Sequence, residues 1–310
     1  MTPSRKILVV DDSKLQRVIL RDILVRHGYE VQEATMVDEA IKVLETFTPE
    51  LILSDIVMPE KNGFELIAYL KENKIPIPVI MITTSNINDY LKLAKKWEVG
   101  HILSKTYSEE QILQYVENIL NQSFFGLDNY LSHLTDKHRI VLHNSKDINT
   151  AMRDIKEYAQ KSMDFHPKKL FYLYYFLGET ITNAFFHAHG FSKEKLPGEI
   201  IILPEGKEVV IEYGHNQKKF GFAVLDQQGT FSRMKALESI ETCLASGDAI
   251  AQGDLSDIPS SGRGIHTIRV MADEFFVNIH KGHKTEVVVL MYPDKSQAQS
   301  PAPSLFINEI

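Results

Sequence analysis

The first 122 residues repeat one pattern five times, a short predicted strand followed by a longer amphipathic segment. The predicted strands span residues 6–10, 30–33, 51–54, 78–83 and 101–104, and most of them are apolar runs. Segments with helical periodicity span residues 13–27, 37–47, 64–73, 86–97 and 108–120. Strands that alternate with helices form a parallel sheet with helices on its faces. We therefore predict an α/β, doubly wound fold with a five-stranded parallel sheet.

Polar residues stand where several of these predicted strands end. They are Asp11, Asp12, Asp55, Thr83 and Lys105. Because the carboxyl ends of parallel strands meet at one edge of the sheet, these side chains should lie together. Clustered carboxylates repel one another unless a cation lies between them, and Mg²⁺ accepts carboxylates together with water and phosphate oxygens. Asp12 or Ser13 could equally serve as the cap of the following helix.

With this set of residues, the segment from 5 to about 122 resembles the receiver domain of two-component response regulators. The resemblance implies that Asp55 accepts a phosphoryl group from a histidine kinase, that Thr83 responds to it, and that Lys105 pairs with it. The Mg²⁺ ligands that it implies are Asp11, Asp12, Asp55 and the carbonyl near Val57. Phosphoryl transfer needs positioning and charge neutralisation, which a metal ion and a lysine supply.

The sequence departs from the receiver pattern at two positions. Thr106 follows Lys105 where the family usually has a proline in a cis peptide. A cis bond before another residue costs about 2.5–4 kcal/mol, so we expect this loop to be trans or strained. Ile102 stands where the family has a switch aromatic. The sequence therefore predicts phosphorylation without the usual ring flip.

Composition limits the possible functions. A length of 310 residues with 44% hydrophobic residues is enough for two globular domains. The net charge of -7 and the lack of a basic stripe argue against a nucleic-acid partner. The single cysteine, Cys243, fits a reducing compartment. Without a signal peptide or a long apolar span, we expect a cytoplasmic protein with no membrane contact.

Two segments flank the predicted second domain, which spans residues 138–292. Apolar residues recur at roughly helical spacing over residues 123–137, which predicts a linker helix. Residues 293–310 are rich in Ser, Pro, Gln and Ala, which predicts a disordered tail. The apolar end of this tail, Leu305 to Ile307, could instead dock on a partner or on its own chain.

The second domain contains an aromatic-rich helical segment at residues 170–189, in which Glu179, Asn183 and His187 are spaced four residues apart. Each step rotates by only about 40° around a helix, so the three side chains form one strip. They could form a solvated face, but the apolar residues beside them favour the lining of a pocket. Downstream, Gly262 and Gly264 precede a predicted helix, where backbone N–H groups can hold phosphates.

These motifs resemble the GHKL ATPase superfamily, and most closely its anti-sigma-factor serine kinases. The resemblance implies an α/β-sandwich of the Bergerat type with a mixed sheet, which binds ATP and Mg²⁺. It implies that Glu179 is the general base and that Asn183 is a Mg²⁺ ligand. The nucleotide-binding residues that it implies are Asn183, His187, Asp226, Gly229, Gly262, Arg263 and Gly264. The implied partner is an anti-sigma antagonist or a sigma factor, and a homodimer is common in both families.

The first glycine box of the second domain departs from its family, because Gln228 stands in place of a glycine. A side chain there takes room that the backbone needs to approach the base, and Gly229 could compensate through a shifted turn. Three functions remain open: an ATP-dependent serine kinase, a non-catalytic partner-binding module with a degenerate site, and a sensor-kinase component. The lack of a phosphohistidine helix disfavours the third. Residues 230–259 would form a lid over the nucleotide.

Overall fold

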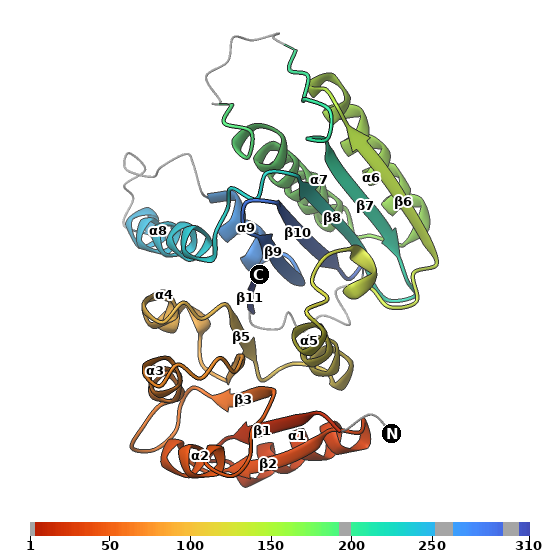
Figure 1. Cartoon of the computed structure of the whole chain (residues 1–310). Helices are drawn as coiled ribbons and strands as arrows, with labels where there is room; N and C mark the ends of the chain where they lie inside the picture. Colours follow the sequence, from red (N-terminus) through yellow and green to blue (C-terminus); the bar gives the residue numbers. More distant parts are fainter. Residues whose placement is uncertain (1–3, 192–199, 252–262, 294–303) are drawn as a thin grey trace. The chain divides into compact units, whose positions relative to one another are not determined.

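The computed structural model describes residues 4–191, 200–251, 263–293 and 304–310, with the backbone alone for residues 245–251 and 263. Within it the chain forms two compact units, Met1–Ser123 and Phe124–Ile310. Figure 1 shows the elements of both units in the order of the sequence. Each unit has its own sheet.

The first unit alternates strands and helices as the sequence predicted. Its strands are β1 (Lys6–Val10), β2 (Glu30–Ala34), β3 (Leu51–Asp55), β4 (Val79–Thr83) and β5 (His101–Ser104), and all are parallel, in the order β2-β1-β3-β4-β5. Its helices are α1 (Lys14–Arg26), α2 (Val37–Leu44), α3 (Gly63–Glu72), α4 (Leu91–Lys96) and α5 (Glu109–Asn121), with a 3-10 turn (Ile87–Tyr90) before α4. The five-stranded parallel fold is confirmed.

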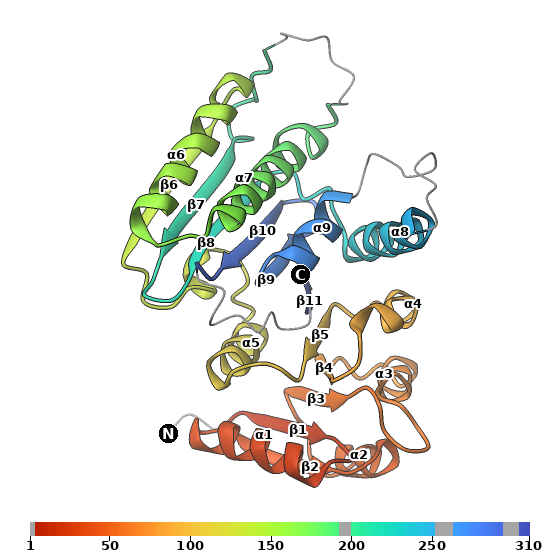
Figure 2. The ribbon, with the colours of Figure 1, turned by 180° about the vertical axis from the view of Figure 1, so that it is seen from behind.

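Helices cover both faces of the first sheet, which explains why its central strands are mainly apolar. All five residues of β3 are buried, including the polar Ser54 and Asp55 at its end. On one face, α1 and α5 lie side by side, joined by an ion pair of 2.9 Å between Arg26 and Glu109 (Figures 1 and 2). The carboxyl ends of β1, β3, β4 and β5 therefore share one edge, where the polar residues gather.

The second unit contains a mixed sheet. Its strands are β6 (Asp136–Leu142), β7 (Val209–His215), β8 (Phe220–Asp226), β9 (Glu274–His280), β10 (Lys284–Met291) and β11 (Leu305–Glu309), in the order β11-β9-β10-β8-β7-β6. All neighbours are antiparallel except β11, which runs parallel to β9. The helices are α6 (Ile148–Ser162), α7 (Pro167–Thr182), α8 (Arg233–Ala251) and α9 (Arg263–Met271). Strands β9 and β10 form a hairpin.

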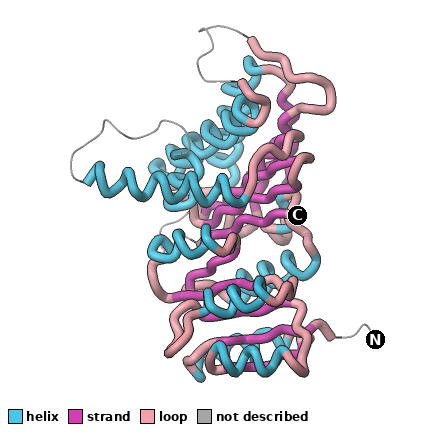
Figure 3. Tube along the Cα trace, turned by 60° about the vertical axis from the view of Figure 1, so that its left-hand side comes forward, coloured by secondary structure: helices cyan, strands magenta, loops and turns pink. Residues whose placement is uncertain are grey.

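The helices of the second unit gather on one side of its strands, as Figure 3 shows. The apolar stripe of α7 supplies Leu173, Phe176 and Leu177 to the core, all of them fully buried. The α-helix gives way to a π-helix at Asn183–His187, where the N–H of Ala188 donates to the carbonyl of Asn183 over 2.9 Å. Wide turns of this kind occur mostly as single-turn bulges, frequently at functional sites.

Two predictions for the flanking segments were wrong. The described backbone after α5 has no linker helix, only a 3-10 turn at Leu127–Asn129, and β6 already begins at Asp136. Gln122 ends α5 with a positive φ of 52°, and Gly126, with φ 99°, interrupts the backbone again before the 3-10 turn. The predicted disordered tail includes a strand, β11, whose backbone pairs with β9 and whose apolar side chains are buried. Residues 294–303 of that tail lie outside the described residues.

Candidate functional sites

The edge of the first sheet brings together the acidic residues and the lysine that the sequence singled out. Carboxylate oxygens of Asp11, Asp12 and Asp55 all lie within 4.8 Å of one another. Lys105 Nζ donates to Asp55 Oδ2 over 2.6 Å and to Asp11 Oδ2 over 2.8 Å. Such a set of hard oxygen donors suits Mg²⁺. In the described part of the chain, this is the one cluster of three or more such ligands.

The charges of this site are imperfectly balanced, because three carboxylates face one ammonium group. Burial raises the pKa of Asp55, and the hydrogen bond and charge of Lys105 counteract this only in part. Burial alone would lower the pKa of Lys105, but its bonds to Asp11 and Asp55 outweigh burial and raise it. A bound cation would relieve the excess negative charge.

The remaining predicted residues lie beside this cluster. Val57 donates its N–H to Asp55 Oδ1 over 3.2 Å, and Thr83 is fully buried at the end of β4. The peptide bond between Lys105 and Thr106 is trans, as are the other described peptide bonds. Ile102 is fully buried in β5, so an aliphatic side chain occupies the position of the usual switch aromatic.

Sequence reasoning missed Tyr107, which stands two residues after Lys105. Burial and the charges of Asp11 and Asp55 raise the pKa of its hydroxyl group far above the ordinary value. The side chain is therefore near the acidic cluster. Its position in the loop after β5 was the only signal in the sequence.

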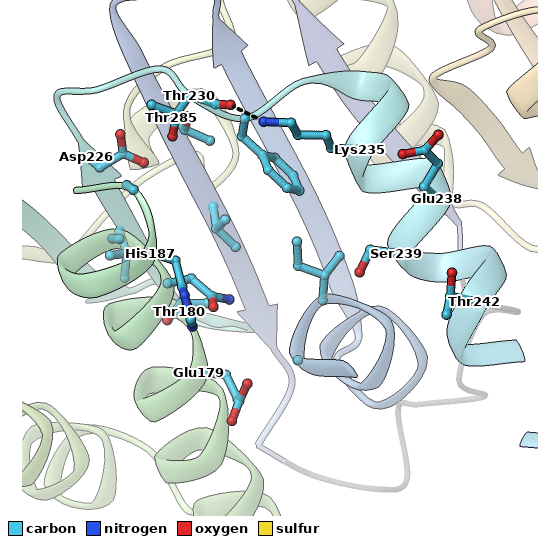
Figure 4. Close-up of a pocket in the computed structure, with 18 residues that line it drawn as sticks. Glu179, Thr180, His187, Asp226, Thr230, Lys235, Glu238, Ser239, Thr242 and Thr285 are labelled. Atoms are coloured by element: carbon cyan, nitrogen blue, oxygen red, sulfur yellow. Dashed lines mark hydrogen bonds between the residues drawn. The ribbon is translucent and has the colours of Figure 1, made fainter. Parts of the chain in front are cut away.

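The second unit contains a cavity of about 550 Å³. Its wall includes Glu179, Asn183, His187, Asp226 and Gly264, five of the residues predicted from the sequence to form a site. Glu179, Asn183 and His187 face the cavity because their four-residue spacing on α7 and the following π-helix places them on one side. Asp226 reaches the cavity from the end of β8. Figure 4 shows Glu179, His187 and Asp226 on one side of the space.

Helix α8, which lies within the predicted lid of residues 230–259, forms the opposite wall of the cavity. Four polar side chains reach the cavity from one face of α8, namely Lys235, Glu238, Ser239 and Thr242 (Figure 4). Their spacing of three and four residues is that of one helical face, a signal that was available in the sequence. Lys235 Nζ also donates to the carbonyl of Thr230 over 3.0 Å, which holds the start of α8 against the preceding loop.

Asp226 is held in place by the turn that follows β8. Its Oδ1 accepts the N–H of Gln228 over 2.8 Å and that of Gly229 over 3.2 Å. Burial raises the pKa of Asp226, and these two bonds lower it by less. Among the described residues, neither Gln228 nor Gly229 belongs to the cavity wall.

Gly229 meets a structural demand of its own. Its φ is 57°, and a Cβ atom there would lie 2.4 Å from His283 N and 2.6 Å from His280 O. The turn thus packs against the backbone of the β9–β10 hairpin, which leaves no room for a side chain. Gly229 therefore serves the packing of the turn against the hairpin and lies outside the cavity wall.

The predicted second glycine box is described only in part. Gly264 lies in α9, where a Cβ atom would be 2.2 Å from Glu179 Oε2. The glycine thus makes room for the Glu179 carboxylate. Gly262 and the side chain of Arg263 lie outside the described residues.

Sequence comparison supports one of the two resemblances. Residues 7–117 match the response regulator receiver domain family. Protein PilH of Pseudomonas aeruginosa is 31% identical over 117 residues, which are 37% of this chain and 97% of that protein. The chain belongs to the response regulator receiver family. Since receiver domains bind Mg²⁺ at a cluster of acidic residues, the set Asp11, Asp12 and Asp55 fits this family.

Other similar proteins match the receiver domain over the same share of the chain. The alkaline phosphatase synthesis transcriptional regulatory protein PhoP of Bacillus subtilis is 32% identical over 120 residues, 39% of this chain. The chain covers only 50% of the length of PhoP. The structure of the chemotaxis response regulator CheY4 of Vibrio cholerae is 27% identical, with a TM-score of 0.35, and covers 38% of this chain and 99% of CheY4. No helix within the described ranges has the length and apolar character to cross a membrane.

Proposed function

We propose that this protein is a response regulator in which phosphorylation of Asp55 by a histidine kinase controls a nucleotide-binding output unit. The receiver domain supplies the phosphoacceptor site, and one of its similar proteins is itself named Histidine kinase P4 of Formosa agariphila. The cavity of the second unit supplies the output site. The two sites lie in separate compact units, so each can be tested alone.

The proposed chemistry at Asp55 is a phosphoryl transfer from a phosphohistidine. A carboxylate oxygen of Asp55 forms a bond to phosphorus while the bond from phosphorus to the histidine nitrogen breaks. Lys105 Nζ, 2.6 Å from Asp55 Oδ2, places a positive charge beside the oxygens of the incoming group. Mg²⁺ held by Asp11 and Asp12 would neutralise further charge. Incubation with acetyl phosphate and Mg²⁺ should add one phosphoryl group, and Asp55→Asn should prevent it.

One observation carries the proposed output function. Five residues that the sequence motifs selected from three distant segments line a single cavity. Its volume of about 550 Å³ lies within the range of small-molecule sites, about 300–1,000 Å³. Gln228, the residue that departs from the motif, is outside the cavity wall, so it leaves the space open. We assign this cavity to ATP.

The contacts suggest a role for each residue in an ATP-dependent serine kinase. Asp226, with Oδ1 bound to two backbone N–H groups, presents its other oxygen to the adenine amino group. Asn183 offers an amide oxygen to Mg²⁺, which takes most of its other ligands from phosphates and water. Glu179 would remove the proton of a serine hydroxyl, whose oxygen bonds to the γ-phosphorus as ADP leaves. The proposed substrate is an anti-sigma antagonist.

Calorimetric titration of Mg-ATP into the full-length protein tests nucleotide binding. We expect micromolar affinity that the Asn183→Ala variant loses, because this substitution removes a metal ligand. No binding by the wild-type protein would contradict the assignment of the cavity. Retained binding by the variant would contradict the role of Asn183.

A second candidate function is a non-catalytic module that binds a sigma factor or an antagonist after phosphorylation. The position of Gly229 favours it, because this glycine packs against the hairpin and leaves the first glycine box incomplete. Partner binding that is unchanged in Asn183→Ala, together with no phosphotransfer, would support this candidate. Phosphotransfer that Glu179→Ala abolishes would support the kinase.

A further inference from the structure

The segment Phe124–Leu131, which follows the receiver domain in the chain, is bound to the sheet of the second unit. We call it the docking segment. Tyr130 packs against Phe276 of β9, with ring centroids 4.4 Å apart and ring planes tilted by 38°. A Cβ atom at Gly221 of β8 would lie 3.1 Å from Leu127 and 3.4 Å from Leu131, so the segment fits closely over this glycine. Figure 1 shows the segment on the near side of β8, while α6 and α7 lie on the far side.

Buried polar groups fix the docking segment at its centre. Gly126 donates its N–H to both carboxylate oxygens of Glu286 on β10, over 3.0 and 3.1 Å. Asn278 of β9 donates to Glu286 Oε2 over 2.9 Å and to the carbonyl of Phe124. Tyr130 donates its hydroxyl to Asn278 Oδ1 over 2.8 Å. Removing one partner of such a network leaves other buried groups unsatisfied, so its members move together.

Strand β10 carries this network on one face and the cavity on the other. Thr285 and Val287 line the cavity, and Glu286 stands between them. Side chains alternate along a strand, so Glu286 points to the opposite face, toward the docking segment. The register pairs Thr285 with Asp226 and Val287 with Val224, and both of these residues of β8 also line the cavity. A shift of Glu286 therefore moves cavity walls on two strands.

We infer that the docking segment is the connection through which the receiver domain regulates the cavity, and that Glu286 is its positioning residue. Helix α5 ends at Asn121, and only two residues separate it from Phe124, so a displacement of the end of α5 pulls directly on the segment. The segment holds β10 through Glu286, and β10 transmits the displacement to Thr285 and Val287. This inference rests on the proposed nucleotide function of the cavity.

The test uses the full-length protein, Mg-ATP, and beryllium fluoride as a phosphoryl mimic. In the wild-type protein, the mimic should change the Kd of Mg-ATP by about 5- to 150-fold. In Glu286→Gln, the ratio of the Mg-ATP Kd values with and without the mimic should fall below about twofold. The Kd without the mimic should stay within about twofold of wild type. If Glu286 had a merely structural role, the substitution would change the Kd of Mg-ATP by the same factor with and without the mimic. A Glu286→Gln variant that keeps the wild-type ratio would overturn the inference.

Hydrogen exchange separates failure of this inference from failure of the proposed function. If the wild-type protein binds no Mg-ATP, the nucleotide assignment fails, but the mimic should still change the exchange rates of β10 amides. That change should be absent in Glu286→Gln. Unchanged β10 exchange in the wild-type protein would overturn the connection, whatever the ligand of the cavity.

Two further variants guard against a trivial loss of folding. Glu274→Gln is the matched control, because Glu274 is a buried carboxylate of β9 that binds Lys219 and Tyr292. It should lower stability and preserve the effect of the mimic. If Glu286→Gln does not fold, Tyr130→Phe takes its place, since it removes only the hydroxyl that donates to Asn278. A wild-type ratio in Tyr130→Phe would then overturn the inference.

Discussion

Substitution of Gly229 by alanine should destabilise the second unit far more than the same change at Gly206. Both glycines have positive φ, 57° and 75°. An L-residue in that conformation costs about 1–2 kcal/mol, and both variants carry this cost. A Cβ atom at Gly206 would meet nothing within 4 Å, whereas at Gly229 it would meet three backbone atoms at 2.4–2.7 Å.

The steric part of the cost at Gly229 sets the size of the difference. Backbone atoms of the hairpin cannot rotate away as a flexible side chain can, and overpacking of this kind costs about 1–3 kcal/mol. We therefore expect Gly229→Ala to lose about 2–5 kcal/mol and Gly206→Ala about 1–2 kcal/mol. The difference corresponds to about 5- to 150-fold in an opening equilibrium.

Hydrogen exchange of the β9 and β10 amides measures this difference within the second unit alone, without assuming that the whole chain unfolds in one step. These amides should exchange about 5- to 150-fold faster in Gly229→Ala than in Gly206→Ala. Equal exchange in the two variants would refute the packing of Gly229 against the hairpin. It would also reopen the possibility that this glycine serves the nucleotide site.

Three further predictions concern the acidic cluster, the cavity and the docking network. Mg²⁺ at about 100 times its Kd should stabilise the wild-type receiver domain by about 2.7 kcal/mol in thermal unfolding. Asp55→Asn should lose most of this stabilisation. Equal stabilisation of the two proteins would contradict the metal site. Gly264→Ala should displace the Glu179 carboxylate by more than about 1 Å and so reduce Glu179-dependent phosphotransfer by about 100-fold. The free energy of unfolding should change by less than about 1 kcal/mol. Full phosphotransfer activity would show that the close fit of Gly264 to Glu179 is unimportant. Burial raises the pKa of Glu286 to about 7, above its unfolded value, so the folded state binds this proton more tightly. The free energy of unfolding should therefore fall by about 3 kcal/mol as pH rises from about 4.5 to about 7, and a Glu286→Gln variant with the same pH profile would disprove this.

The receiver domain could be predicted well because short stretches of its sequence identify its strands, its helices and its site residues. The apolar runs mark the inner strands, which helices cover on both faces, and the parallel arrangement follows from the alternation alone. Asp11, Asp55 and Lys105 then meet because strand ends share one edge. Both departures from the receiver pattern can also be read from single positions. Ile102 replaces the switch aromatic, and Thr106 replaces the proline, so the peptide bond before it is trans.

The second unit was harder to predict because its decisive contacts join distant residues. The strip from Glu179 to His187 could be placed on one helix face, but the π-helix at its end has no local signal that we can identify. Gly229 is constrained by a hairpin more than fifty residues later, as its contacts with His280 and His283 show. The apolar residues of β11 likewise do not indicate from their own spacing that this segment pairs with β9.

The docking segment shows the same limit. Its apolar spacing suggested a helix, but Gly126 breaks the helical backbone and donates its N–H to Glu286, 160 residues later. Spacing of apolar residues indicates which side chains are buried, and here Leu127, Tyr130 and Leu131 are indeed buried. It does not indicate the surface that buries them.

The most direct test of the regulatory proposal compares Mg-ATP affinity in two states of the receiver domain. Calorimetric titration of the full-length protein with beryllium fluoride bound is compared with the same titration of Asp55→Ala, which cannot be phosphorylated. Control of the cavity by Asp55 predicts affinities that differ by at least about fivefold. Equal, measurable affinities would contradict it, and would show that the two units work independently.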